Sequence, residues 1–228
     1  VTYLTEPGAL QDWLHGARQM LHPDGLLVVD AFLPRDVAPF ETEKKVMGLP
    51  RPAGDLVRKA VGEFVDEVSR DTPAPGGGSI AAYMGALGAA LATMVANLSS
   101  HKAGWDDRWE EFSDWAVKGQ QIKDELLMLV DEDTNAFNKV MDAFGLPKNT
   151  DEEKAARTAA IQSATRYATE IPFRTMERTY DAVEFIKEMA EHGNPNSASD
   201  AGVGALCARA AVMGAYLNVK TNAAALKD

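Results

Sequence analysis

The sequence predicts an all-α fold, a bundle of five or six long helices joined by short connections. Apolar residues recur at helical spacing through most of the chain after about residue 55. Start and stop signals separate these stretches, among them Gly145 as a C-cap and a capping box of Thr150 with Glu153. Only one short β-like run stands out, Leu26–Phe32, and a single strand cannot form a stable sheet.

Composition narrows the class of protein. The chain has 228 residues, 46% of them hydrophobic and 25% charged, which is an ordinary globular balance. A net charge of −11 argues against a surface for nucleic acid or for an anionic membrane. The single cysteine, Cys207, cannot form an internal disulfide, and the first residues lack the pattern of a signal peptide. We therefore expect a cytoplasmic protein.

Residues 1–40 differ from the rest of the chain. They combine a helical pattern with the strand-like run and a turn at His22–Gly25, and this "HPDGLLVVDAFLP" stretch resembles the late part of an S-adenosylmethionine-dependent methyltransferase. The glycine-rich cofactor strand of that family is absent, so we interpret residues 1–40 as a fragment or appended segment without methyltransferase activity. Residues 41–54, with Pro50, Pro52 and an acid–base cluster, are predicted to be a linker.

Residues 55–228 are predicted to form the helical domain. Pro172 can either kink the fourth of its helical patterns or start a further helix. A Gly/Pro loop follows at His192–Asn196. The predicted helices are Leu56 to about Thr72, Ser79 to about Ser100, Trp109 to Phe144, Asp151 to about Ile171, a continuation to about Glu191, and Ser199 to about Lys227.

A glycine-rich turn opens the second helix. Gly76, Gly77 and Gly78 let a ligand approach the main chain closely, and Ser79 is a natural N-cap. A helix N-terminus of this kind can bind an anion or polar group, but a tight turn into a core helix is an equally good interpretation. The uncharged run Ile80–Leu98 approaches the length of a membrane span. Its alanines and glycines, and the lack of an aromatic belt, favour a buried helix of a soluble bundle.

Five segments together resemble the formimidoyltetrahydrofolate cyclodeaminase and methenyltetrahydrofolate cyclohydrolase family. They occur in family order between about Leu56 and Asp228. The segments are "FVDEVSRDTPAPGGGSIAAYMGALGAALATMVANLS", "LVDEDTNAF", "LPKNTDEEKAARTAAIQ", "GNPNSASDAGVGAL" and "GAYLNVKTN". In bifunctional members this domain follows a transferase half, which is absent from this sequence, and members usually continue into another helix beyond Asp228.

The family reaction joins N10 of 5-formimidoyltetrahydrofolate to the formimidoyl carbon, with loss of ammonia, and gives 5,10-methenyltetrahydrofolate. A positioned carboxyl group can move both protons. The candidates are Asp131, Glu132 and Asp133. On a helix Asp131 and Asp133 point about 200° apart, and Asp133 lies near apolar neighbours while Glu132 is expected to be solvated. The resemblance places the family's catalytic aspartate at Asp133, with Asp131 as the second candidate. Burial should raise the proton affinity of Asp133.

Other polar residues are candidates for substrate binding. The main chain of Gly76–Ser79 could hold the pterin or the amidine, and the lysines could meet folate carboxylates. Each lysine is equally consistent with a plain surface residue, and Asp200 with an ordinary acid at a helix start. These candidates are Gly76, Gly77, Gly78, Ser79, Lys102, Lys148, Asn194, Asn196 and Asp200. No spacing of ligand residues indicates a metal, and we expect no tightly bound cofactor besides the tetrahydrofolate substrate, possibly polyglutamylated.

Three hypotheses about function follow. The first is a cyclodeaminase, the second a cyclohydrolase acting on the same carbon, and the third an inactive bundle that binds folate or only itself. The linker-like "VAPFETEKKV" and the "SSHKAGWDDRWEEF" stretch resemble the bifunctional enzymes and favour the deaminase. The nearly uncharged runs Ile80–Leu98 and Gly202–Val219 predict a homodimer or higher homo-oligomer.

Overall fold

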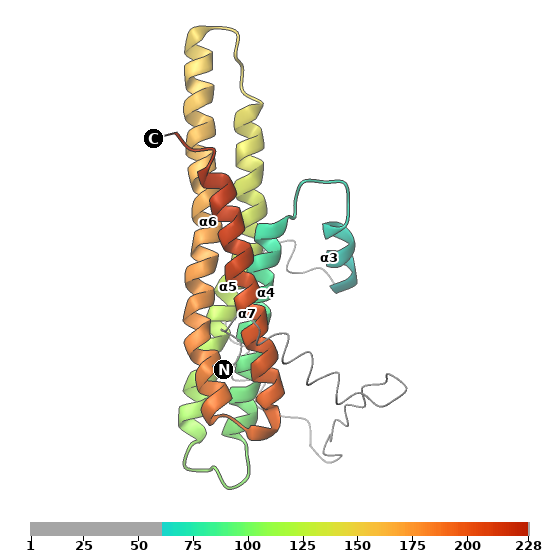
Figure 1. Cartoon of the computed structure of the whole chain (residues 1–228), viewed down its shortest axis with the longest axis vertical. Helices are drawn as coiled ribbons and strands as arrows, with labels where there is room; N and C mark the ends of the chain where they lie inside the picture. Colours follow the sequence, from blue (N-terminus) through green and yellow to red (C-terminus); the bar gives the residue numbers. More distant parts are fainter. Residues whose placement is uncertain (1–60, 228) are drawn as a thin grey trace, which may run out of the picture. The chain divides into compact units, whose positions relative to one another are not determined.

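The computed structural model describes residues 61–227, and the regular structure within that range is helical. Four long helices form an antiparallel bundle in which α4 contacts α5, α6 and α7 (Figure 1). The elements are α3 (Val61–Val68), α4 (Gly77–Ser100), α5 (Trp109–Phe144), α6 (Asp151–His192), the 3-10 turn η2 (Pro195–Ser197) and α7 (Ala198–Ala223). The all-α prediction is confirmed. The predicted appended segment 1–40 and linker 41–54 lie outside the described residues.

The described residues contain five helices, in agreement with the predicted five or six. Four of them are long, and the first predicted helix, Leu56 to about Thr72, is described only from Val61, as α3. Pro172 neither ends nor starts a helix, because it lies inside α6, which is 42 residues long. The predicted limits of α5 and the capping box of Thr150 with Glu153 are confirmed.

A side chain from α7 compensates for Pro172. Proline has no N–H, so the carbonyl of Ala168, four residues earlier, loses its helical donor. The amide Nδ2 of Asn222 donates to that carbonyl at 2.7 Å. A buried carbonyl without a donor is costly, and this contact from another helix is one reason that α6 can continue.

Small residues bring α4 and α7 close together. A Cβ at Gly88 would lie only 2.9 Å from the carbonyl oxygen of Gly204 and 3.3 Å from the nitrogen of Ala208. Because these are main-chain atoms, the two helices could not keep this spacing with a larger residue at Gly88. The bulk of the core comes instead from α5 and α6, whose largest fully buried side chains are Phe112, Leu126, Ile171, Phe185 and Met189.

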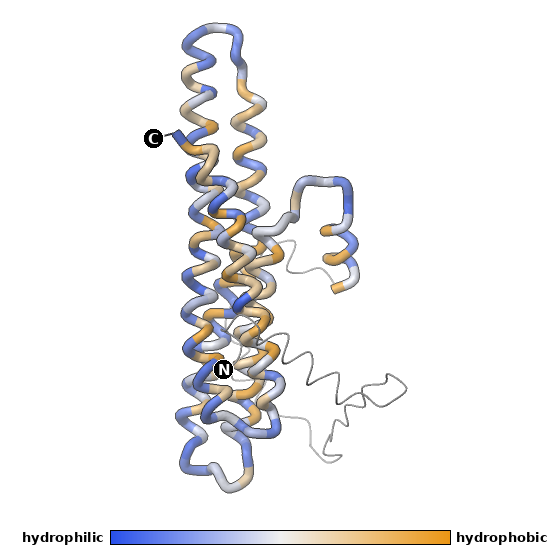
Figure 2. Tube along the Cα trace, viewed as in Figure 1, coloured by the Kyte–Doolittle hydropathy of each residue, from blue (hydrophilic) through white to orange (hydrophobic). Residues whose placement is uncertain are grey.

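Two helical stretches, α4 and Pro195–Ala223, are long and apolar enough to cross a membrane. The apolar window of α4 is 61% buried in the bundle, whereas that of Pro195–Ala223 is 22% buried. Figure 2 shows apolar residues along much of α4 and α7 and polar residues at the loop that joins α5 to α6. Burial identifies α4 as a core helix, and the apolar outer face of α7 needs a separate explanation.

The helix α4 begins at Gly77, two residues earlier than predicted, with Gly76 as its N-cap. Ser79 is therefore not the N-cap, because it lies inside the first turn and its side chain points to α5. The helices α5 and α6 continue as a hairpin beyond the start of α4 and the end of α7 (Figure 1). The start of α4 thus lies against the middle of a longer helix pair.

Candidate active site

The start of α4 meets the carboxyl group of Asp133 on α5. The hydroxyl of Ser79 donates to Asp133 Oδ2 at 3.0 Å, and its oxygen lies 3.2 Å from Thr134 Oγ1. The main-chain N–H of Ser79 also bonds the carboxyl group. These donors belong to the first turn of α4, where N–H groups have no partner within the helix. A carboxyl group at this position accepts hydrogen bonds, and the positive end of the helix dipole stabilises its charged form.

Burial raises the pKa of the Asp133 carboxyl above its ordinary value, and the side-chain and main-chain hydrogen bonds from Ser79 act in the opposite direction. The net effect is upward, since desolvation of the charged form is the largest contribution. The expectation that apolar surroundings would raise the proton affinity of this residue is confirmed. A carboxyl group of this kind can hold a proton and release it, as an acid/base catalyst requires.

Two glycines allow other groups to approach the main chain closely at this carboxyl group. A Cβ at Gly78 would lie 2.6 Å from Asp133 Cγ and 2.7 Å from Oδ2, so any side chain there would displace the carboxyl group. At Gly77 the nearest atom to a Cβ would be Asn218 Nδ2 of α7, at 3.4 Å. The glycine turn thus lets α4, α5 and α7 meet at one place.

The neighbouring acids on α5 have different surroundings. Glu132 accepts a short hydrogen bond from the hydroxyl of Tyr167, and Lys139 Nζ lies 3.8 Å from the same carboxyl group. The bond to Glu132 and burial raise the pKa of Tyr167 to about 12. The prediction that Glu132 is simply solvated is therefore wrong, because the side chain is half-buried and links α5 to α6. Asp131 is also half-buried.

The other predicted binding residues lie away from Asp133. At the far end of α4, Asn194 N–H donates to Ser99 Oγ, and Lys102 lies 3.9 Å from the centre of the Trp105 ring. Twenty residues of helix separate Ser99 from Ser79, which is about 30 Å. Asn196 and Asp200 belong to η2 and the first turn of α7, also at that end.

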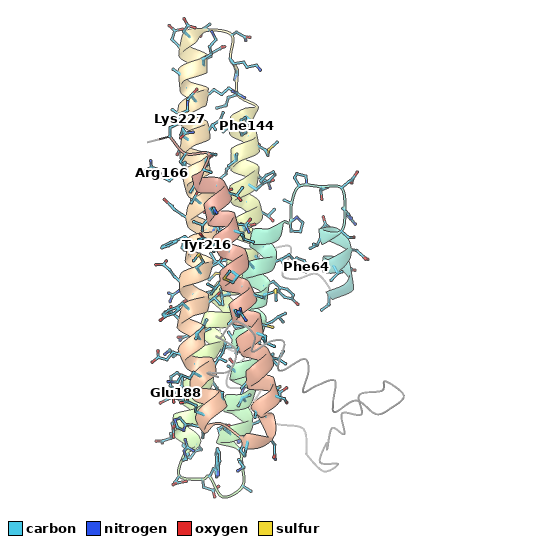
Figure 3. The ribbon with its side chains drawn as sticks, viewed as in Figure 1. Phe64, Phe144, Arg166, Glu188, Tyr216 and Lys227 are labelled. Atoms are coloured by element: carbon cyan, nitrogen blue, oxygen red, sulfur yellow. The ribbon has the colours of Figure 1, made fainter. Side chains whose placement is uncertain are left out.

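Lys148 is exposed in the loop between α5 and α6, beyond the opposite end of α4. Figure 3 labels Phe144 toward the α5–α6 loop and Glu188 toward the opposite end of the bundle. One cluster at the Glu188 end, formed with Glu191 and His192, has ligand atoms within 4.8 Å of one another. These side chains are largely exposed, and His192 already pairs with Glu188 at 3.8 Å. The structure thus groups Gly76–Ser79 with Asp133 and separates them from Lys102, Lys148, Asn194, Asn196 and Asp200.

Three residues near this group were missed by sequence reasoning, namely Thr134, Tyr167 and Asn218. Thr134 and Asn218 both lie within segments that carried the family resemblance, "LVDEDTNAF" and "GAYLNVKTN". Thr134 follows Asp133 directly in the sequence, so it could have been recognised as a neighbour of the carboxyl group. The partner of Tyr167 is on another helix, and Asn218, which bonds Gly214 O of its own helix, lies near Gly77 only in the folded chain, so no local signal indicated them.

Comparison with known proteins shows the family to which the chain belongs. The profile of the family described as formiminotransferase-cyclodeaminase matches residues 60–228. The chain belongs to the formiminotransferase-cyclodeaminase family. A methenyltetrahydrofolate cyclohydrolase of Methylorubrum extorquens is 42% identical over 165 residues, which are 72% of this chain and 79% of the relative. The fold is also that of a formiminotetrahydrofolate cyclodeaminase from Thermotoga maritima, with a TM-score of 0.66 and 31% identity over 75% of this chain and 81% of the other.

The formimidoyltransferase-cyclodeaminase of Gallus gallus is 37% identical over 206 residues. These make up 89% of this chain but only 38% of that protein. The family relationship predicted from the five segments is thus confirmed. Members of the formiminotransferase-cyclodeaminase family act on folates, and the relatives of this chain carry the names of two different reactions, cyclodeaminase and cyclohydrolase.

Proposed function

We propose that this domain is a formimidoyltetrahydrofolate cyclodeaminase and that Asp133 is its acid/base. The observation that carries this proposal is the partly buried carboxyl group of Asp133, held by Ser79 at the start of α4 beside a glycine turn without side chains. Buried carboxyl groups with raised pKa values occur preferentially at functional sites. The Thermotoga maritima relative bears the name of this reaction.

The reaction needs one group that moves protons between two nitrogens. N10 attacks the formimidoyl carbon and forms a C–N bond while losing its proton. The C–N bond to the formimidoyl nitrogen then breaks, and that nitrogen takes up a proton and leaves as ammonia. Asp133 accepts the first proton as a carboxylate and donates it as a carboxylic acid. This exchange is efficient when the pKa of the group lies closer to neutrality than that of a solvated aspartate.

Substrate contacts are assigned first to the main chain of Gly76–Ser79, which adjoins Asp133. Lys148, Lys102, Asn194, Asn196 and Asp200 remain proposals for binding the rest of a folate, possibly polyglutamylated. Because the last four lie at the far end of α4, they could reach the same ligand only from a second copy of the chain. Asp131 remains the second candidate for proton transfer. The proposal requires no tightly bound cofactor. It also places the protein in the cytoplasm.

A cyclohydrolase is the second candidate function. It is favoured by one observation, the 42% identity to the Methylorubrum extorquens protein of that name. In this reaction water attacks the methenyl carbon, and the same carboxyl group would take the proton from that water. The methenyl chromophore distinguishes the two reactions: a deaminase forms it from 5-formimidoyltetrahydrofolate and releases ammonia, and a hydrolase consumes it. An inactive bundle would do neither.

The variant Asp133→Asn tests the assignment of the carboxyl group. The amide keeps the shape but cannot exchange protons, so we expect kcat to fall about 10²- to 10⁴-fold. Circular dichroism should show an unchanged fold, since the variant only replaces a buried acid by a neutral group. Glu132→Gln is the matched control and should stay within a few-fold of the parent. An active Asp133→Asn with an inactive Asp131→Asn would mean that Asp131 is the acid/base.

A further inference from the structure

The hydroxyl groups of Ser79 and Thr134 form a short chain that ends on the Asp133 carboxyl group. Ser79 is fully buried, and its Oγ lies 3.0 Å from Asp133 Oδ2 and 3.2 Å from Thr134 Oγ1. A side chain with no exposed surface is poorly placed to bind a substrate. Its contacts are instead with the residue that is proposed to carry the proton.

Counting donors fixes the direction of this chain. A serine hydroxyl has one hydrogen and two lone pairs. The hydrogen of Ser79 goes to Asp133 Oδ2, so Thr134 must be the donor in its contact with Ser79. A hydroxyl that accepts a hydrogen bond becomes a better donor to the next group. Thr134 therefore strengthens the bond that Ser79 makes to Asp133.

Oδ2 of Asp133 is thus the acceptor of the Ser79 hydrogen bond when the carboxyl group is ionised. When the acid is protonated and Ser79 keeps this bond, the proton lies on Oδ1. Oδ1 is the carboxyl atom nearest to the position of a Cβ on Gly78, so glycine at this residue makes room for it. Oδ1 therefore faces the main chain of the glycine turn, to which the proposed substrate contacts are assigned.

We propose that Ser79 and Thr134 are positioning residues that hold Oδ2 of Asp133, so that Oδ1 is the oxygen that transfers the proton. This inference rests on the proposed role of Asp133 and changes the predicted role of Ser79 from substrate binding to positioning. Thr134 becomes a functional residue that acts through Ser79.

Few charged groups lie near this chain of hydroxyls. The helix α4 has no charged residue, and its contribution to the site is the hydroxyl and N–H of Ser79. On α5 the neighbouring charges are Asp131, Glu132 and Lys139, and the last two contact Tyr167 of α6 and each other. From α7 the residue at the glycine turn is the neutral Asn218. Ser79 is thus the main polar partner of the Asp133 carboxyl among the described residues.

The titration of Asp133 tests the proposal directly in the intact chain. Hydrogen bonds to a carboxylate favour the ionised form, so Ser79→Ala should raise the pKa of Asp133 by about 1. Thr134→Val should raise it by a smaller amount, and Thr134→Ser should restore the parent value. The measurement is the carboxyl ¹³C chemical shift against pH, with the Asp133 signal identified by its loss in Asp133→Asn. Ser99→Ala removes another fully buried serine of α4 and should leave this titration unchanged.

The pH profile of turnover gives a second readout. Because the ionised form of Asp133 accepts the first proton, a higher pKa moves the acidic limb of kcat to higher pH. We expect this displacement in Ser79→Ala, with KM unchanged because the variant keeps the main chain of residue 79 and the buried Ser79 side chain does not touch the substrate. A parent-like titration and profile in Ser79→Ala would overturn the positioning role. Activity in Asp133→Asn would instead overturn the proposed function, while the titration of Ser79→Ala would still decide whether the hydroxyls control this carboxyl group.

Discussion

The carboxyl group of Asp133 fills the space that a side chain at residue 78 would need. The position of a Cβ on Gly78 coincides with the carboxyl group, which lies at the free end of a side chain. The chain could therefore accept alanine at residue 78 by turning the carboxyl group away, at the cost of its bond to Ser79. Activity therefore depends on glycine at residue 78, because a side chain there would displace the Asp133 carboxyl group.

We predict that Gly78→Ala folds but loses most of its activity. The displaced carboxyl group should lower kcat by about 10²-fold, the lower range for loss of a positioned acid/base. Gly202→Ala is the control, because no atom lies within 4 Å of its Cβ position. This control should keep full activity and gain about 0.5–1 kcal/mol of helix stability. The measurements are turnover and urea unfolding, and parent-like turnover in Gly78→Ala would contradict the site geometry.

At the scale of elements, α6 depends on α7 at its proline. Asn222 supplies the donor that Pro172 cannot, and Gln162 of α6 similarly bonds Ala225 O and the N–H of Lys227 just beyond α7. The end of α7 is thereby joined to α6 by polar contacts, whereas α4 and α7 meet through small apolar residues. Helix pairs in one bundle are thus held by different kinds of interaction.

We predict that Asn222→Ala lowers the free energy of unfolding by about 1 to 3 kcal/mol, because it leaves the Ala168 carbonyl without its donor. In a Pro172→Ala background the main-chain N–H of residue 172 is restored, and the same change should cost less. A double-mutant cycle by urea unfolding measures this difference. Equal costs in both backgrounds would show that Asn222 does not compensate for Pro172.

At the scale of the whole bundle, α4 and α7 present one apolar outer face. Residues spaced alternately by three and four follow each helix, a pattern typical of helix–helix contacts. Leu87 is 39% exposed and Met213 57% exposed, and neither stripe contains a charged residue. The stripes are Ile80, Met84, Leu87, Leu91, Met94 and Leu98 on α4, and Val203, Leu206, Ala210, Met213 and Leu217 on α7. Such a face, about 27 Å long on α4, is suited to a second copy of the chain.

We predict a homodimer through this face, measured by sedimentation at micromolar concentration. Leu87→Glu or Met213→Glu should give a folded monomer, because each buries a charge in the dimer. Val117→Glu, on an exposed position of α5, should remain dimeric. A monomeric parent would contradict the prediction, and a parent that sediments with phospholipid vesicles would indicate that the face binds a membrane instead.

The sequence by itself determined the helical class, the limits of α5 and the buried character of Asp133. Each of these depends on local signals, namely helical periodicity, capping residues and the neighbours three and four positions away. The unbroken α6 was not decided locally, because the donor that replaces the missing N–H of Pro172 comes from another helix.

Only the tertiary structure decided which residues share a site. The register between α4 and α5 brings Ser79 to Asp133, 54 residues along the chain, and places Asn194 and Lys102 about 30 Å from them. This register is set by close contacts between the two helices, such as that at Gly85, where a Cβ would lie 3.3 Å from Leu126, and by large side chains that fill the rest of the core. The pattern of any single helix contains no information on it, because packing joins residues that are distant in sequence.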